Sequence, residues 1–195
     1  MKSLWPTIMN VSLALTTFGQ AQPKMVPVPS NATMELPNFS MHAPSGEGWR
    51  GTNPDENTVE IRFYNSQMKA AITVEDKRLA NPVPNVEGKL SQLSQAIEKR
   101  FSEHGKLILS EHVVETRPGA QCLYQRIIIN SPELTAPGLP PGNVAIHELE
   151  CIYGRAHQGF ATFRYMYPTQ GSADEQKKVA QSFFSGINFK LPPAK

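Results

Sequence analysis

The residues that could perform chemistry are concentrated in one stretch, Ala120 to Tyr167, which holds both cysteines and the segment HELEC at 147–151. A zinc protease motif needs two histidines four residues apart on a helix, with a glutamate between them. Here the residue four after His147 is Cys151, and the segment has the alternation of a strand. Four residues along a strand span about 13 Å, whereas zinc bonds are about 2.0–2.3 Å long. We therefore expect no metal ion on Cys122, Cys151 and His147, and no cofactor.

The two cysteines are instead placed to bond to each other. Residues 120–130, 144–153 and 159–167 have strand character, and the loop at 131–143 is centred near Pro137. A simple antiparallel hairpin then sets Cys122 directly opposite Cys151, where Cβ atoms lie roughly 4.5–5.5 Å apart, a spacing that suits a disulfide. We predict a Cys122–Cys151 disulfide. The alternative is two buried thiols that act as small hydrophobic residues.

No catalytic residue is assigned. A cysteine nucleophile with His147 as its base meets the same distance problem as the zinc site, and His157 lies in a turn where we expect it to be exposed. The sequence has no C-x-x-C motif, nucleophile elbow, P-loop or dinucleotide fingerprint. Glu148 and Glu150 share one face of their strand and could form an acid pair, but we expect that face to be solvated.

A second hairpin, centred near Ala156, would bring Tyr165 opposite His147. The first hairpin sets Arg126 opposite His147, with Tyr124 two residues earlier. Tyr124, Arg126, His147 and Tyr165 would then share one side of the sheet, and we call them the predicted face. Two interpretations remain open. The residues could be a polar border beneath a packed helix, satisfied by hydrogen bonds, or a small recognition surface, because aromatic residues and arginine are enriched at binding hot spots. The loop 131–143 could serve as a binding loop beside it.

The remaining elements favour an α+β fold in which an antiparallel sheet of about six strands has two main helices packed on it. Alternating apolar residues predict a strand at 39–43 and a hairpin formed by 59–64 and 68–75. Helical spacing predicts a helix over 86–104, capped by Asn85, and a second helix that begins with the capping box of Ser172 and Glu175. A strand at 107–115 precedes the central stretch.

The N-terminus predicts export. Lys2 precedes an apolar, uncharged run, and Gly19 and Ala21 are the small residues of a signal cleavage site. We expect residues 1–21 to be a signal peptide cleaved after Ala21, 22–38 an extended proline-rich leader, 39–191 one domain, and 192–195 a tail. The mature chain would lie in the periplasm or be secreted, with no transmembrane segment, and an oxidising compartment permits the disulfide.

The mature chain would also be nearly neutral, because only Lys2 is lost from the 19 Lys and Arg residues that face 17 Asp and Glu residues. A neutral domain has no electrostatic footprint for nucleic acid and no polybasic patch for a membrane surface. A protein or a component of the cell envelope is the expected partner, and the sequence leaves the oligomeric state open.

Four segments together resemble the PsbP-like superfamily, which includes DcrB-like exported bacterial proteins. They are an opening strand that runs into APSGEGW, the hairpin VEIRFYNSQMKAAITV, the segment ILSEHVVETRPGAQ after a long helix, and a final helix ending in FFSGINF. The resemblance covers about Phe39 to Phe189 and implies an α/β/α sandwich, an antiparallel sheet with helices against it. It implies no catalytic set.

The leading hypothesis is therefore an exported, non-enzymatic binding or assembly-accessory protein. The alternative is a small-ligand pocket protein or a hydrolase that uses Tyr124, Arg126, His147 and Tyr165.

Overall fold

The computed structural model describes residues 25–52, 60–131, 142–169 and 173–190. Its elements, in chain order, are β1 (Met25–Pro27), β2 (Thr33–Glu35), β3 (Phe39–His42), β4 (Trp49–Thr52), β5 (Glu60–Asn65), β6 (Ala70–Arg78), α1 (Val86–Ser102), β7 (Lys106–Arg117), β8 (Ala120–Ser131), β9 (Gly142–Tyr153), η1 (Arg155–His157), β10 (Gly159–Pro168), α2 (Ala173–Ser185) and β11 (Asn188–Phe189). Most of the loop 131–143, Ser172 of the predicted capping box, and the segments 1–24 and 191–195 lie outside the described residues.

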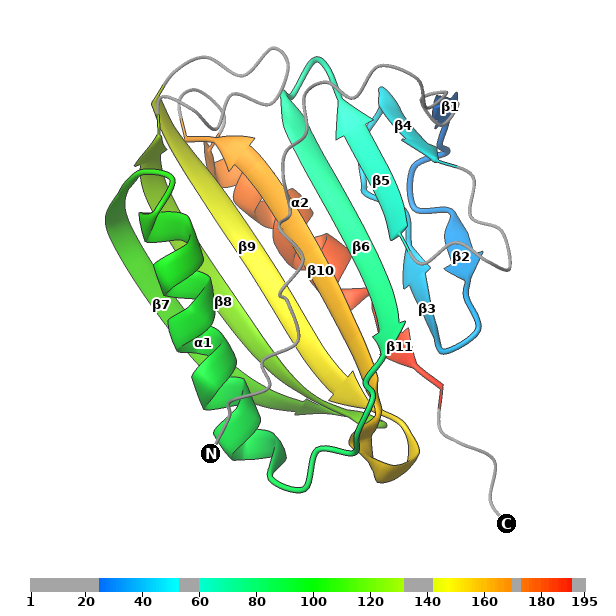
Figure 1. The fold of residues 1–195 in the computed structure, drawn as a ribbon. Helices are drawn as coiled ribbons and strands as arrows, with labels where there is room; N and C mark the ends of the chain where they lie inside the picture. The colour runs from blue at the N-terminus through cyan, green and yellow to red at the C-terminus, as the bar shows by residue number, and fades with distance from the viewer. Residues whose placement is uncertain (1–24, 53–59, 132–141, 170–172, 191–195) are drawn as a thin grey trace, which may run out of the picture.

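The described strands form two antiparallel sheets (Figure 1). The large sheet has eight strands in the order β1-β4-β5-β6-β10-β9-β8-β7, and the small one has the order β11-β3-β2. Helix α1 covers one face of the large sheet, over β7, β8 and β9, and α2 lies against the other face. The α+β class and the two packed helices are thus confirmed.

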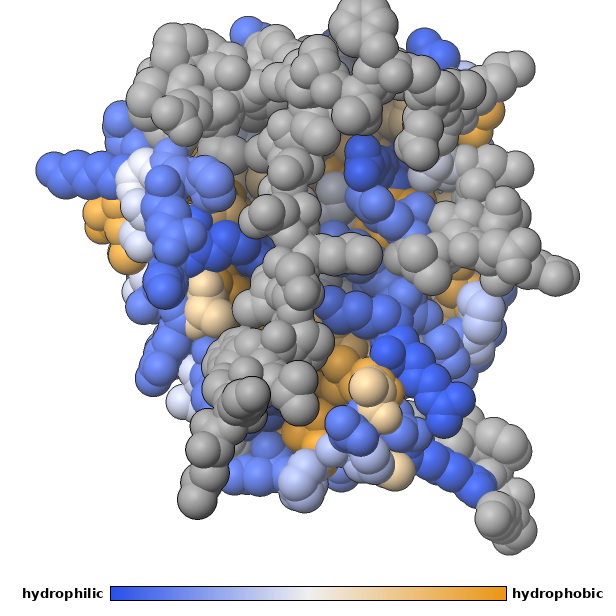
Figure 2. All heavy atoms as spheres, viewed as in Figure 1, coloured by the Kyte–Doolittle hydropathy of each residue, from blue (hydrophilic) through white to orange (hydrophobic). Residues whose placement is uncertain are grey.

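Each face of the large sheet has its own apolar core. On the α1 face, residues such as Leu90 and Ile97 of the helix pack on Leu123, Ile127 and Ile146 of the sheet. The α2 face is more aromatic and includes the cluster formed by the rings of Phe39, Phe163 and Phe189. On the outer surface of the α1 side, hydrophilic residues predominate over the helix (Figure 2).

The expectation of about six strands was too low for the large sheet. The strand predicted at 39–43 is β3, which belongs to the small sheet, and two short strands, β1 and β4, extend the large one. Residues Met25–Pro27 fall within the segment expected to be a leader, and they pair with β4. The three residues of β1 are too few to show alternation, and Pro27 argues against a strand except at a sheet edge, where β1 lies.

The helix predicted over 86–104 is α1, Val86–Ser102, and the predicted cap is present: the Asn85 side chain accepts a hydrogen bond from the backbone N–H of Gly88 at 2.9 Å. This bond satisfies one of the N–H groups that have no partner within the helix.

Both predicted hairpin registers are present in the structure. Cys122 lies opposite Cys151 and Arg126 opposite His147 in the β8–β9 pair, and Tyr165 lies opposite His147 in the β9–β10 pair. The two cysteines are fully buried and joined by a disulfide with an S–S distance of 2.08 Å.

A close contact also fixes the start of β10. Gly159 lies directly opposite Tyr153, and a Cβ atom added at Gly159 would collide with the Tyr153 ring. That ring is 5.0 Å from the Phe189 ring, and its hydroxyl donates a hydrogen bond to Asp76. The glycine is needed here for space.

The disulfide gives a first prediction. Replacing both Cys122 and Cys151 by alanine removes a link between residues 29 positions apart, so the free energy of unfolding should fall by about 3–4 kcal/mol in the chain-entropy account. Denaturant titration of the double variant and of the parent chain, each with and without reductant, measures this. Reductant should destabilise only the parent; an equal effect on both proteins would contradict the prediction.

Candidate functional site

The centre of the predicted face is buried beneath α2. His147 has no exposed surface, and both of its ring nitrogens are engaged. Nδ1 lies 2.5 Å from the Tyr124 hydroxyl, and Nε2 lies 3.1 Å from the Tyr167 hydroxyl, with the Tyr167 ring stacked on the imidazole. A neutral imidazole has one donor and one acceptor nitrogen, so two tyrosine hydroxyls satisfy it completely.

The other two residues of the predicted face bind elsewhere. Tyr165 donates a hydrogen bond to Oε1 of Gln176 on α2 at 2.8 Å, and the Gln176 amide donates to the carbonyl of Met68 at 2.8 Å. Arg126 points to the sheet edge and donates to Glu111 at 3.3 Å. The structure therefore joins Tyr124 to His147 and places Tyr165 and Arg126 in separate hydrogen-bonding groups.

Tyr167 is a member of this group that the sequence reasoning missed. It lies two residues after Tyr165 on β10, so it points to the same face of the sheet. Its ring centroid is 5.5 Å from that of Tyr165. The signal was available in the predicted register, which sets Tyr167 diagonally across from His147.

Burial determines the electrostatics of this group. Burial, followed by the charges of Arg126 and Lys177, lowers the pKa of His147 to about 4. Burial raises the pKa of Tyr124 to about 12. At neutral pH the imidazole is uncharged and the phenol keeps its proton. A general base works best when its pKa lies near the operating pH, and the pKa of His147 lies well below neutral pH.

The opposite face corrects a second expectation. Glu148 and Glu150 were expected on a solvated face, but both are buried under α1. Glu148 accepts hydrogen bonds from Arg100 of α1 at 2.7 Å and from Arg164 of β10 at 2.5 Å. Alternation along β9 correctly put the two carboxyl groups on one side, but the helix that packs over this central strand removes them from water.

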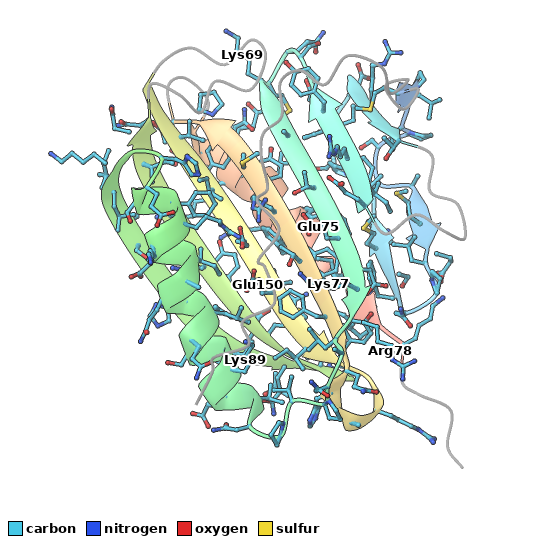
Figure 3. The ribbon with its side chains drawn as sticks, viewed as in Figure 1. Lys69, Glu75, Lys77, Arg78, Lys89 and Glu150 are labelled. Carbon is cyan, nitrogen blue, oxygen red and sulfur yellow. A yellow bond between two sulfur atoms is a disulfide. The ribbon has the colours of Figure 1, made fainter. Side chains whose placement is uncertain are left out.

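The two carboxyl groups have opposite protonation states. Arg164 and Arg100 overcome the cost of burial and lower the pKa of Glu148 to about 2. Burial and the adjacent charge of Glu148 raise the pKa of Glu150 well above its usual value. Glu150 therefore holds its proton to higher pH than an ordinary glutamate and hydrogen bonds to Glu148, while its Oε2 atom is buried without a partner. Glu150 lies on the α1 side of the sheet (Figure 3). Separated pKa values also occur in acid–base pairs of enzymes.

Two shallow cavities lie elsewhere on the described surface. One, of about 290 Å³, lies at the start of α1, and the other, of about 240 Å³, lies between Arg117 and the end of α2. Neither is lined by His147, Glu148 or Glu150.

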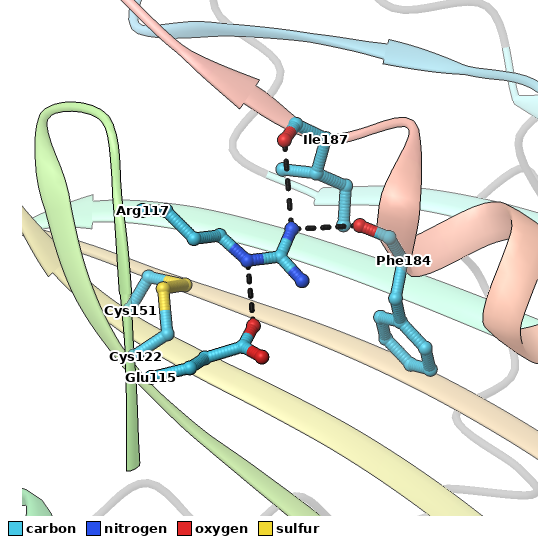
Figure 4. Close-up of polar contacts among 6 residues, drawn as sticks. All are labelled: Glu115, Arg117, Cys122, Cys151, Phe184 and Ile187. Atoms are coloured by element: carbon cyan, nitrogen blue, oxygen red, sulfur yellow. Dashed lines mark hydrogen bonds and ion pairs between the residues drawn. A yellow bond between two sulfur atoms is a disulfide. The ribbon is translucent and has the colours of Figure 1, made fainter.

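Arg117, beside the second cavity, links two elements through hydrogen bonds (Figure 4). Its guanidinium donates to Glu115 at 2.6 Å and to the backbone carbonyl of Phe184 at 2.7 Å. The last carbonyls of a helix have no partner within it, so Arg117 fastens the end of α2 to the end of β7.

Two further properties concern only the described residues. They contain no group of three or more His, Cys, Asp or Glu side chains that could hold a metal ion. Within the same ranges, neither helix is long and apolar enough to cross a membrane.

The comparisons with known proteins identify the fold. The solution structure of cyanobacterial PsbP (CyanoP) from Synechocystis sp. PCC 6803 is similar, with a TM-score of 0.51 over 89% of this chain and 99% of that chain, at 12% sequence identity. The chain therefore has a PsbP-like fold, as its sequence segments indicated. No family model matches the sequence, and no curated protein matches it.

The two buried groups should give opposite pH dependence. The folded pKa of His147 is lowered, so the unfolded chain binds its proton first and stability falls as the pH drops. From an ordinary value of 6.5 and a folded value of about 4, this loss is about 2 kcal/mol between pH 7 and pH 5. Glu150 has a raised pKa, so its contribution is complete at low pH and is lost as the pH rises above the value for the unfolded chain.

Denaturant titrations of His147→Gln, Glu150→Gln and the parent chain between pH 5 and pH 7 separate the two contributions. The stability difference between parent and His147→Gln should grow with pH, and that between parent and Glu150→Gln should shrink. Parallel curves for all three proteins would contradict both assignments.

Glu148 should be the costlier carboxyl group to lose. Glu148→Gln leaves the buried Arg164 without its carboxylate, and removing one partner of a buried ion pair typically costs about 3–5 kcal/mol. Glu111→Gln is the matched control, because Glu111 pairs with Arg126 at an exposed site, where ion pairs contribute about 1 kcal/mol or less. Thermal and denaturant unfolding of the two variants at pH 7 should rank them in this order.

Proposed function

We propose that this chain is an exported, non-enzymatic binding or assembly-accessory protein whose partner is another protein. The observation that carries the proposal is the burial of His147 with both ring nitrogens bound to tyrosine hydroxyls. The acid pair and the cysteines are buried as well: Glu148 is paired with Arg100 and Arg164, and Cys122 is bonded to Cys151. These groups stabilise the fold, and none of them borders either shallow cavity.

Export is supported by the disulfide and by the N-terminal sequence. Disulfides persist in oxidising compartments and are rare in the cytosol, and the Cys122–Cys151 bond links two adjacent strands of the core. The PsbP-like fold agrees with a binding role only by analogy, because one fold supports many functions.

Arg126 and His147 distinguish this proposal from the pocket or hydrolase alternative. We expect the His147→Ala variant to lose stability and the Arg126→Ala variant to change little, because Arg126 makes a partly exposed ion pair. Unfolding titrations measure the stability of both variants. Partner capture by each variant is then measured at a temperature where that variant is folded. Unchanged stability of His147→Ala together with loss of a ligand or of an activity would favour the alternative.

Partner capture is the direct test. The tagged, oxidised mature chain is cross-linked in the native exported fraction and recovered under denaturing conditions. The Cys122→Ala/Cys151→Ala variant, which has the same net charge but no disulfide, is the control. We expect a defined protein species in stoichiometric amount. Recovery of the tagged chain alone, at every cross-linker length, would overturn the proposed function.

A further inference from the structure

The large sheet ends in two very different edges. β7, at one end of the strand order, has 12 residues and pairs along its length with β8. β1, at the other end, has three residues and contains Pro27. Within the described ranges no strand pairs with the outer side of β7. The outward N–H and C=O groups of such an edge are a template for another strand, which proteins usually block with short strands, proline or charge.

β7 also carries the exposed apolar side chains. The large hydrophobic residues exposed in the described structure are Ile108, Val113 and Val114, at 51%, 52% and 46%, and all three lie on this strand. Val113 and Val114 are adjacent, so they point to opposite faces of the sheet. An added strand would contact both. The irregularity at Ile108 interrupts the start of β7, which leaves 109–117 as the regular part of the edge.

Acidic residues flank one of the two valines. Glu111, Val113 and Glu115 alternate along β7 and therefore share the α2 face. The Glu111 side chain is 60% exposed and Glu115 is 36% exposed. Glu111 pairs with Arg126 of the neighbouring β8, and Glu115 pairs with Arg117, two residues further along β7 itself, so each carboxylate is held in place along the edge.

We propose that β7 binds an extended segment of a partner protein as an additional antiparallel strand. The segment carries a β-branched apolar residue opposite Val113 and basic residues opposite Glu111 and Glu115, because opposite charges across a strand pair stabilise it and like charges destabilise it. This inference rests on the proposed function and names the surface and the chemistry of the partner. The mode of binding combines backbone hydrogen bonds for affinity with alternate side chains for specificity.

In the register that sets Val113 against Val113, the same charges argue against a second copy of this chain as the occupant. If two β7 strands paired antiparallel with Val113 opposite Val113, Glu111 of each would lie opposite Glu115 of the other. Two pairs of like charges would then flank the apolar contact, each of which is destabilising. A basic strand converts both positions into attractive pairs.

The probe is the peptide Thr-Lys-Val-Val-Thr-Lys-Thr, acetylated and amidated, which sets its lysines opposite Glu115 and Glu111 in the antiparallel direction. The control peptide has glutamate in place of both lysines. Binding to the full oxidised chain is followed by two-dimensional NMR, which gives a Kd and the residues that shift. We expect shifts along 109–117, and a Kd for the acidic peptide at least about tenfold weaker.

Matched variants test the surface. Val113→Lys/Val114→Lys places on the edge the residue that native edges use for protection, and Ser91→Lys/Gln95→Lys adds the same charge to exposed positions of α1. The first variant should weaken peptide binding at least about tenfold and the second should leave it unchanged. Equal binding by both variants, shifts confined to other elements, or a parent chain that dimerises through β7 in sedimentation would overturn the proposal.

The same variants distinguish failure of the β7 assignment from failure of the proposed function. If Val113→Lys/Val114→Lys still captures the cross-linked protein partner, the binding function stands and the β7 assignment fails. If the parent chain captures no partner, the proposed function itself fails.

Discussion

The buried carboxylate of Glu148, held between Arg100 of α1 and Arg164 of β10, is the interaction on which the rest of the structure depends. It ties the long helix to the central strands through a carboxylate that has no exposed surface. Strand β9 is covered on both faces, so each of its polar side chains must be satisfied inside the protein. Glu148 is satisfied by two guanidinium groups, and His147, the next residue back, by two tyrosine hydroxyls on the other side.

This constraint explains why the residues with the most reactive side chains are not at the surface. The centre of the chain carries cysteines, histidine and glutamates in close succession, and the fold uses each as an internal contact. Within the described residues β7 keeps an unpaired outer edge, since α1 and α2 pack on the faces of the sheet and cannot hydrogen bond to its edge.

The hairpin registers could be predicted from the sequence, but the burial of the side chains and the number of strands could not. Symmetric hairpin registers correctly paired Cys122 with Cys151 and His147 with Tyr165, because turn position and strand alternation are local properties. The burial of Glu148 and Glu150 was wrongly predicted, since alternation says which residues share a face but not which helix covers that face. The strand number was also wrong, because β1 and β4 are too short to show a period and exist only through pairing with their neighbours.

The contact between Gly159 and Tyr153 has an evolutionary consequence. No side chain fits at position 159 unless the aromatic ring opposite gives way, and that ring is itself anchored to Asp76 and packed on Phe189. Position 159 therefore cannot accept a larger residue while the Tyr153 ring keeps its place, so glycine should be retained there wherever an aromatic residue stands opposite.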